Sequence, residues 1–553
     1  MQIILIRHGQ AEHQSSTDAN RSLTAQGEAQ AQQTAAWLVN HGFQLDGLFV
    51  SPYVRAQQTA AHISQALDVP ITTCEFIKPD SQPQATVKWL EQLELPEQAV
   101  VALVCHMPIV GRLASFFIDG DINQGFAFQL AQAKVIETGG ESLRQGMSLM
   151  LEDIQKGRIS LTDESAFEVG RNVATTEGTV VFENRLFQLI QYKPLTKTVH
   201  QTPLLMVPPC INKFYILDLQ PENSLVRYAV EQGHTVFLVS WANPDQSMAD
   251  VTWDDYIEEG AITAIETVQA ITKQNKINAF GFCVGGTIVS TALAVLADRG
   301  IHPAASLTLL TTLLDFSNTG VLDVFVDELQ VSMREQTIGQ GGLLPARDLA
   351  STFSSLRPND LVWNYVQSNY LKGQKPPAFD LLYWNSDSTN LPGPMFCWYL
   401  RNTYLENSLR VPGKLKVAGN PVDLGKIDAP VFIYGSREDH IVPWQAAFAS
   451  TAILNPKKKT RNRFILGASG HIAGVINPAS KNKRNYWTND KIPADAQVWF
   501  DGATECPGSW WPEWADFLSE HGGKMVKAPI KAGAVGYSEI ESAPGRYVKV
   551  RAD

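Results

Sequence analysis

The segment from Gly281 to Gly286 constrains the fold of this chain more than any other. It reads Gly-Phe-Cys-Val-Gly-Gly, follows an apolar-leaning run at 277–280 and precedes residues 287–294, which suit a helix. The pattern predicts a strand, a tight turn that holds Cys283, and a helix. Glycines suit such a turn because its backbone is strained and passes close to other backbone. Cys283 is therefore a candidate nucleophile, since a thiolate suits acyl transfer through a thioester.

Two later segments supply an acid and then a histidine as candidate partners for Cys283. Asp439 lies in the loop after a predicted strand at 431–435, and His471 lies in the loop after another at 463–466. Nucleophile, acid and histidine follow one another in this order in the α/β-hydrolase fold, whose catalytic loops follow strands. We therefore predict a triad in which Asp439 orients His471 and His471 deprotonates Cys283. The alternative is a buried cysteine in an ordinary turn between a strand and a helix.

The size and composition of the chain exclude several classes of protein. At 553 residues it is too long for one ordinary domain, and about two to four domains are expected. Its net charge of −11 argues against a nucleic-acid-binding surface. The six cysteines lack metal-ligand spacing, so we expect reduced thiols, no metal site and a cytoplasmic location. No apolar run of about eighteen residues predicts a membrane span, and the N-terminus lacks the basic region of a signal peptide.

The first 138 residues have a pattern of their own, in which predicted strands end at residues suited to phosphate chemistry. The strands and the residues that follow them are Gln2–Ile6 with Arg7 and His8, Gly47–Val50 with Arg55, and Val100–Val104 with His106. Predicted helices at 25–39 and 56–66 lie between the strands, which implies a parallel sheet. An imidazole can attack phosphorus while guanidinium groups bind the equatorial oxygens. The pattern therefore favours a phosphoryl-transfer site over the alternative that these are scattered surface residues.

This segment, about 1–137, resembles the histidine phosphatase superfamily, in particular the small phosphohistidine phosphatases of the SixA type. The family's Arg-His-Gly motif matches residues 7–9, which implies that His8 accepts the phosphoryl group. The resemblance also implies phosphate-binding roles, carried by Arg7, Arg21, Arg55 and His106. A strong acid is not evident, since Met107 follows His106. A phosphoimidazole leaves easily, so this fits a phosphohistidine protein as the substrate.

The rest of the chain, from about 139 to 553, resembles the catalytic part of class I poly(3-hydroxyalkanoate) synthases. The matching segments are Phe167–Asn172, Pro208–Leu219, Ser240–Asp245, Gly281–Gly286, Tyr383–Asn385, Glu438–Trp444, Gly470–Gly474 and Ser509–Trp514. The resemblance implies that Cys283 takes the acyl group of an (R)-3-hydroxyacyl-CoA and releases coenzyme A. His471 would be the general base and Asp439 would tune it. No cofactor is expected, because coenzyme A belongs to the substrate.

Other residues of the large domain receive weaker predictions. The backbone N–H of Val284, the residue after the nucleophile, is expected to stabilise the oxyanion, with a second donor from the loop near Cys210. Asp218, Trp384 and His440 lie in matching segments and are predicted to be close to the substrate. A structural role is the favoured interpretation for Asp218. Core packing of the cap is favoured for Trp384, and a local hydrogen-bonding role for His440.

These observations predict an α/β fold class with two catalytic domains. A histidine-phosphatase-like domain is expected at 1–137, ending in a strand at 126–136. A helical connector follows at 138–166, and an α/β-hydrolase domain at 167–553 carries a cap insert at about 318–425. The cap is linked to dimer contacts in the resembling family, which implies a homodimer. The growing polyester implies a location in the cytoplasm at the surface of a polyester granule.

Two other functions remain open at this stage. A thioesterase or lipase could use the same fold, although a hydrolase would usually carry serine at position 283. The protein could also be a granule-associated adaptor with both sites idle. The intact set of catalytic residue types disfavours an adaptor.

Overall fold

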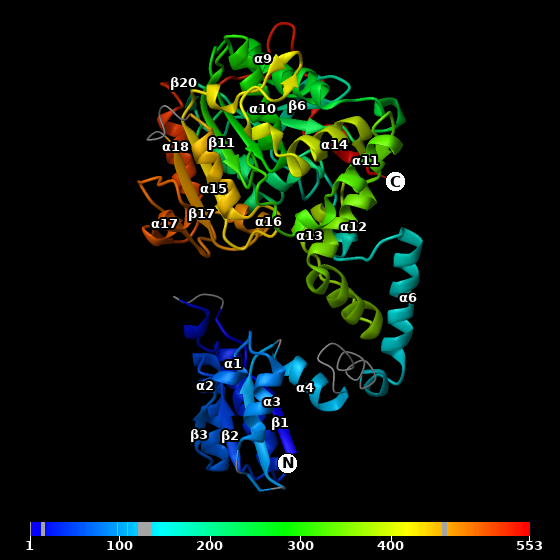
Figure 1. Cartoon of the computed structure of the whole chain (residues 1–553), viewed down its shortest axis with the longest axis vertical. Helices are drawn as coiled ribbons and strands as arrows, with labels where there is room; N and C mark the ends of the chain where they lie inside the picture. The colour runs from blue at the N-terminus through cyan, green and yellow to red at the C-terminus, as the bar shows by residue number, and fades with distance from the viewer. Residues whose placement is uncertain are drawn as a thin grey trace. The chain divides into compact units, whose positions relative to one another are not determined.

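The computed structural model describes residues 2–12, 17–93, 95–96, 98–107, 109–119, 134–455 and 462–552. It divides into two compact units, and the first combines Met1–Glu152 with Val366–Gln374. The second combines Asp153–Tyr365 with Lys375–Asp553 (Figure 1). The division falls within helix α6 (Glu141–Lys156), inside the connector predicted at 138–166. In the described part of the chain, no helix is long and apolar enough to cross a membrane.

The first unit contains a four-stranded parallel sheet in the order β1-β4-β2-β3. Its main elements are β1 (Gln2–Arg7), α1 (Ala25–Asn40), β2 (Gly47–Val50), α2 (Val54–Leu67), β3 (Ile71–Thr73), α3 (Pro83–Glu91), β4 (Val100–Cys105) and α4 (Ile109–Asp119). Along β4, Ala102 and Val104 pack with α1 and α2, whereas Val101 and Leu103 pack with α3 and α4. Helices thus cover both faces, and the strands predicted at 2–6, 47–50 and 100–104 are confirmed.

Two features of the first unit differ from the sequence expectations. The strand expected at 126–136 lies outside the described residues except at its end, where residues 134–137 are helical and the prediction is wrong. Thr138 N–H donates to the carbonyl of Lys134 at 3.0 Å, a helical bond that an extended strand cannot make. Residues 366–374, expected in the cap, group with the first unit. A Cβ on Gly146 of α6 would lie 1.9 Å from the carbonyl oxygen of Tyr370, so glycine allows these backbones to touch.

The second unit is built on an eleven-stranded sheet in the order β19-β18-β17-β16-β11-β10-β8-β9-β6-β5-β21. The strands are β5 (Gly178–Glu183), β6 (Phe187–Tyr192), β8 (Leu204–Val207), β9 (Val236–Trp241), β10 (Ile277–Phe282), β11 (Ala304–Leu310), β16 (Val431–Ser436), β17 (Arg463–Gly467), β18 (Asn485–Thr488), β19 (Thr504–Pro507) and β21 (Glu541–Ser542). The six central strands from β17 to β9 are parallel. Their carboxyl ends therefore meet at one edge, where ligands of such sheets bind.

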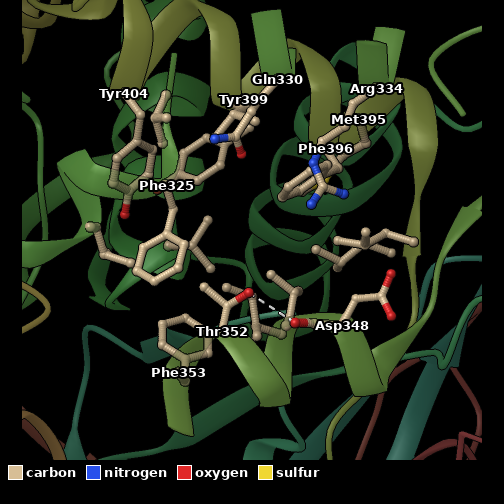
Figure 2. A pocket seen from close by; sticks show the side chains of 18 of the residues that line it. Phe325, Gln330, Arg334, Asp348, Thr352, Phe353, Met395, Phe396, Tyr399 and Tyr404 are labelled. Carbon is tan, nitrogen blue, oxygen red and sulfur yellow. Dashed lines mark hydrogen bonds between the residues drawn. The ribbon is translucent and has the colours of Figure 1, made fainter. Parts of the chain in front are cut away.

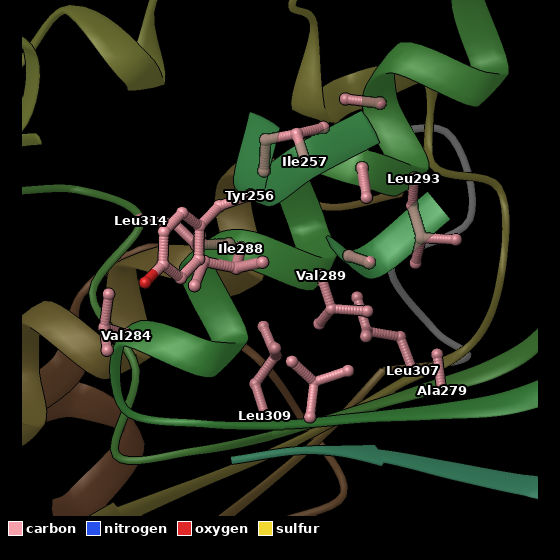
Figure 3. Packing of buried hydrophobic residues seen from close by; sticks show 14 of the residues in the cluster. Tyr256, Ile257, Ala279, Val284, Ile288, Val289, Leu293, Leu307, Leu309 and Leu314 are labelled. Atoms are coloured by element: carbon pink, nitrogen blue, oxygen red, sulfur yellow. The ribbon is translucent and has the colours of Figure 1, made fainter. Parts of the chain in front are cut away.

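Helix α10 (Val284–Asp298) begins directly after the candidate nucleophile, and every residue from Val284 to Leu296 is buried. Its Val289 and Leu293 face Leu307 and neighbouring residues of β10 and β11, whereas Ile288 lies beside the ring of Tyr256 (Figure 3). Burial of each such side chain stabilises the fold by about 1.5–3 kcal/mol. The start of α10, and with it the turn at Cys283, is thereby held firmly on the sheet.

A helical insert separates β11 from β16, in the range where a cap was expected. It includes α11 (Glu328–Thr337), α12 (Ala346–Leu356), α13 (Asp380–Asn385), α14 (Gly393–Tyr399) and the π-helical η11 (Leu400–Leu405). Arg401 of η11 donates to the carboxylates of Glu335 at 2.5 and 2.8 Å and of Glu328 at 2.9 Å. These charge-assisted bonds tie α11 to η11 within the insert.

Candidate active sites

Cys283 stands at a strained turn between β10 and α10. Its backbone has φ 53° and ψ −127°, a region that non-glycine residues rarely adopt. The surrounding glycines permit close backbone contact: a Cβ on Gly281 would lie 2.3 Å from the Cα of Gly286, and one on Gly285 would lie 2.2 Å from the carbonyl oxygen of Val207. Local sequence thus builds a sharp strand-to-helix turn that presents the thiol at the edge of the sheet.

The three residues predicted as a triad come together at the carboxyl edge of the sheet. Asp439 follows β16 and His471 follows β17, and the two side chains form a hydrogen bond of 2.6 Å between Oδ2 and Nδ1. Cys283 and His471 line the same cavity, and the thiol lies near enough to the imidazole to help raise its pKa. The other oxygen of Asp439 accepts from the N–H groups of Ile441 and Val442, each at 2.8 Å. Both carboxylate oxygens are therefore engaged, and the plane of the acid is fixed.

The electrostatics of the triad favour a basic imidazole. Burial lowers the pKa of His471, but attraction to Asp439, its hydrogen bond to Asp439 and the contact with Cys283 outweigh burial and raise the pKa to about 10. An ionised carboxylate only accepts hydrogen bonds, so Nδ1 of His471 carries the proton shared with Asp439, and Nε2 is the nitrogen left for proton transfer. The arrangement can take a proton from Cys283 at Nε2 and stabilise the imidazolium that forms.

A cavity of about 370 Å³ opens onto the triad. Cys283, His471, Trp384 and His440 all line it, together with Phe379 and other residues of the insert. The indole N–H of Trp384 donates to the carbonyl of Lys213 at 2.6 Å, which fixes the orientation of the ring in the wall of the cavity. The structure therefore places Trp384 and His440, two of the three residues predicted to be close to the substrate, beside the nucleophile.

Asp218 lies elsewhere and does not line that cavity. Its buried carboxylate accepts from the hydroxyl groups of Thr176 at 2.5 Å and Ser224 at 2.6 Å. Burial raises the pKa of Asp218, although the hydrogen bonds oppose that effect. The structure thus corrects its assignment as a substrate-proximal residue: Asp218 joins the start of α7 (Leu225–Glu231) to the strand region before β5, a contact that only long-range packing creates.

A second, largely apolar cavity of about 120 Å³ is lined by residues of the insert, among them Phe325, Tyr399 and Tyr404 (Figure 2). Val284 lines it together with Cys210 and Ile211, the residues expected to supply the oxyanion donors. As the first residue of α10, Val284 has an N–H that no earlier helical turn can accept. Ile211 and Phe353 line both cavities, so the two spaces adjoin at these residues. Sequence reasoning missed this cavity, because its aromatic walls read as ordinary core residues.

In the first unit, the residues predicted to bind phosphate gather at the ends of β1, β2 and β4. The rings of His8 and His106 lie 4.9 Å apart, and the Nε–H of Arg55 donates to Nε2 of His8 at 3.1 Å. His106 shares a hydrogen bond of 2.7 Å with the hydroxyl of Ser51. Arg7 and Arg21 line a neighbouring cavity of about 530 Å³ together with His8. The arrangement concentrates positive charge around one imidazole nitrogen.

His8 is prepared to act as a nucleophile at neutral pH. Burial lowers its pKa to about 4, against a backbone hydrogen bond that raises it, and Arg55, Arg7 and Arg21 add to the lowering. Burial, with His8 and Arg55, also lowers the pKa of His106 to about 3. Nδ1 of His8 lies 2.6 Å from the carbonyl oxygen of Gly9, so Nδ1 carries the proton and Nε2 keeps a lone pair.

Asp18 is a residue of this site that sequence reasoning missed. It lies on the short 3₁₀ helix η1 (Asp18–Asn20), and its carboxylate pairs with Arg21 at 2.8 Å and with Arg55 at 2.9 Å. The spacing of an acid three residues before an arginine was the available signal, but it does not reveal the contact with Arg55 across the fold.

Three family models match the chain. Residues 123–229 match the N-terminal part of poly-beta-hydroxybutyrate polymerase, and residues 203–478 match the alpha/beta hydrolase fold. Residues 3–78 match branch 1 of the histidine phosphatase superfamily. The polymerase match begins upstream of the boundary expected at 137, so it overlaps the segment assigned to the first domain.

Individual relatives were found for both parts. The poly(3-hydroxyalkanoate) polymerase subunit PhaC of Cupriavidus necator is 67% identical over 427 residues, which are 76% of this chain and 72% of that protein. The subunit of the same name from Rhizobium meliloti is 42% identical over 423 residues, 76% of this chain and 68% of that protein. A solved structure of the protein histidine phosphatase SixA with tungstate is 27% identical, covers 23% of this chain and 82% of that one, and has a TM-score of 0.22.

Proposed function

The chain belongs to the poly(3-hydroxyalkanoate) polymerase family, and from that premise we propose that Cys283 carries the growing acyl group as a thioester. The activity is polymerisation of 3-hydroxyacyl units, and the substrate is an acyl-CoA. We propose (R)-3-hydroxybutyryl-CoA as a representative substrate. The observation that carries the proposal is the Cys283–His471–Asp439 arrangement, with its bond of 2.6 Å between acid and histidine, in a chain of this family.

The proposed reaction has two acyl transfers. In the first, Nε2 of His471 takes the proton from Cys283, and the thiolate attacks the thioester carbonyl of the substrate. The N–H of Val284 stabilises the oxyanion, and the sulfur of coenzyme A leaves with the proton from His471. In the second transfer, His471 takes the proton of a 3-hydroxyl group, and that oxygen attacks the carbonyl carbon of the acyl-Cys283. A new ester forms as the bond from the carbonyl carbon to sulfur breaks, and His471 returns its proton to the sulfur, so that the thiol of Cys283 is free again.

Several features of the site favour polymerisation over hydrolysis. Much of the wall of the cavity beside Cys283 is apolar and includes Phe353 and Phe379 of the insert, which disfavour water near the thioester. A second apolar cavity adjoins it and offers more water-excluding space. The reaction needs no cofactor, because coenzyme A arrives with the substrate and leaves as a product.

The test measures coenzyme A release and polymer mass from (R)-3-hydroxybutyryl-CoA. We expect the two quantities to rise together in the native chain. Cys283→Ala should abolish both, and Cys283→Ser should retain at most a trace because His471 is matched to a thiol. Substantial polymer from the alanine variant would remove Cys283 from the mechanism. Release of free 3-hydroxybutyrate as the main product would favour the thioesterase alternative instead.

The first unit supports a second function, removal of a phosphoryl group by His8. The specific observation is a neutral imidazole whose Nε2 lone pair points among arginines. In the proposed step Nε2 attacks phosphorus, the bond from phosphorus to the substrate imidazole breaks, and that imidazole leaves with a proton from water. A water molecule then attacks phosphorus, the bond to His8 breaks, and phosphate leaves. A protein that carries phosphohistidine is the proposed substrate. His8→Ala should abolish phosphate release from such a protein, and retained release would refute the assignment.

The insoluble product implies where the polymerase works. We propose that it functions as a homodimer in the cytoplasm, at the surface of the polyester granule that it makes. Sedimentation of the native chain with polymer, and its mass in solution before substrate is added, test the two parts separately.

A further inference from the structure

The carboxylate of Asp18 pairs with two of the arginines that surround His8. Its Oδ1 accepts from Arg21 at 2.8 Å and its Oδ2 accepts from Arg55 at 2.9 Å. Arg55 also donates to the backbone carbonyl of Asp18. One carboxylate thus bridges two of the guanidinium groups proposed to bind the phosphoryl oxygens, so the protein neutralises its own anion site.

The burial of the partners explains why an internal anion is favourable. The side chain of Arg55 is only 5% exposed, whereas that of Asp18 is 53% exposed. A buried guanidinium without a counter-charge is costly, so some anion must pair with Arg55 when no substrate is bound. Asp18 can supply that charge and later return to water at little cost, because most of its side chain is already solvated.

The same contacts hold Arg55 in a pose that blocks the nucleophile. Its Nε–H donates to Nε2 of His8 at 3.1 Å, and this is the lone pair that must attack phosphorus. With its other nitrogens bound to Asp18, Arg55 cannot leave the imidazole without exchanging partners. A phosphoryl group that replaces Asp18 would draw the guanidinium toward its oxygens and release Nε2.

Asp18 is also a poor candidate for a proton donor. Partial burial raises its pKa, but hydrogen bonds from Arg55 and Arg21 outweigh burial and lower the pKa below its usual range. Asp18 is therefore a carboxylate at neutral pH and can compete with anions for Arg21 and Arg55.

We propose that Asp18 is an internal competitor that exchanges with the phosphoryl group at Arg21 and Arg55 and keeps the His8 site closed to weaker anions. The proposal rests on the phosphatase function proposed for the first unit. A tethered carboxylate acts at a local concentration in the millimolar range or above, so free carboxylates of the same charge displace it poorly. A phosphoryl group brings three oxygens and about −1.5 to −2 charges at pH 7, which is enough to win the exchange.

Orthovanadate binding to the full chain, measured by calorimetry, tests this exchange. We expect Asp18→Asn and Asp18→Ala to bind vanadate about tenfold more tightly than the native chain. This factor applies if Asp18 occupies the arginines in about nine-tenths of the native molecules, because only the remaining tenth could then bind vanadate directly. Asp80→Asn is the matched control, because Asp80 is exposed and its loss changes the net charge equally. The control should bind like the native chain. Millimolar acetate should weaken vanadate binding to the Asp18 variants but not to the native chain.

The outcomes separate this proposal from the phosphatase function itself. Vanadate binding that is equal or weaker in both Asp18 variants, with normal binding by the native chain, would overturn the competitor role and leave the phosphatase function standing. If the native chain and Arg55→Gln fail alike to bind vanadate, the phosphatase function falls and this inference falls with it. A gain in Asp80→Asn equal to that in Asp18→Asn would also overturn the proposal, since net charge alone would explain it.

Discussion

Asp439→Asn is expected to slow coenzyme A release by about a thousandfold, because it reverses the protonation of the two nitrogens of His471. In the native site, Oδ2 of Asp439 accepts from Nδ1 of His471, while Oδ1 accepts from the N–H groups of Ile441 and Val442. An asparagine has only one oxygen for these three donors. If that oxygen faces the two backbone N–H groups, the amide NH₂ faces His471 and requires Nδ1 to accept. Nε2 then carries the proton and cannot take one from Cys283.

The magnitude follows from the alternative amide orientation. Turning the oxygen toward His471 restores the productive tautomer but leaves the N–H groups of Ile441 and Val442 facing donors. Each buried, unsatisfied donor costs about 1–3 kcal/mol, so the productive orientation is disfavoured by about 4 kcal/mol. That difference corresponds to about a thousandfold in population. The pKa of His471 should also fall, because burial would no longer be opposed by the charge of Asp439.

The assay is the initial rate of coenzyme A release from (R)-3-hydroxybutyryl-CoA, measured by chromatography and repeated across pH. Asp428→Asn serves as a control because Asp428 is an exposed acid outside the triad. The control should retain the native rate, and thermal unfolding should show that both variants fold. A rate for Asp439→Asn within tenfold of native would refute the reasoning, since the carboxylate would then not determine the tautomer.

Three further predictions concern the fold and the independence of the sites. Gly281→Ala should destabilise the second unit by about 1–3 kcal/mol in urea unfolding, because its Cβ would lie 2.3 Å from the Cα of Gly286; native stability would contradict the close contact. His234 is buried, and burial together with His200 lowers its pKa to about 3, so the unfolded chain binds a proton that the folded one does not. The contribution of His234 to the free energy of unfolding is then complete above about pH 6.5 and falls at lower pH, by about 2 kcal/mol at pH 5. His234→Leu should remove this part of the acid destabilisation, and an unchanged pH dependence of unfolding would contradict the prediction. His8→Ala should leave polymerisation within about twofold of native, whereas loss of polymer from a folded variant would show that the two sites are coupled.

Local sequence determined the elements that carry the chemistry. The glycines around Cys283 specify a strand, a turn and a helix because only glycine tolerates the backbone contacts at Gly281 and Gly285. The apolar runs before His8 and His106 specify the parallel strands β1 and β4, whose carboxyl ends share one edge. Such features depend on a few neighbouring residues and on the periodic placement of apolar residues, so they can be predicted from the sequence alone.

Tertiary structure alone decided which side chains meet. Asp218 matched a family segment but bonds to Thr176 and Ser224 in a buried cluster away from the cavity. Asp18 carried no strong signal, yet folding sets it across from Arg55, 37 residues away in the sequence. The segment at 366–374 left the expected cap because Gly146 allows α6 to contact it. Each of these outcomes depends on packing between segments distant in sequence, and local residue patterns do not encode those distances.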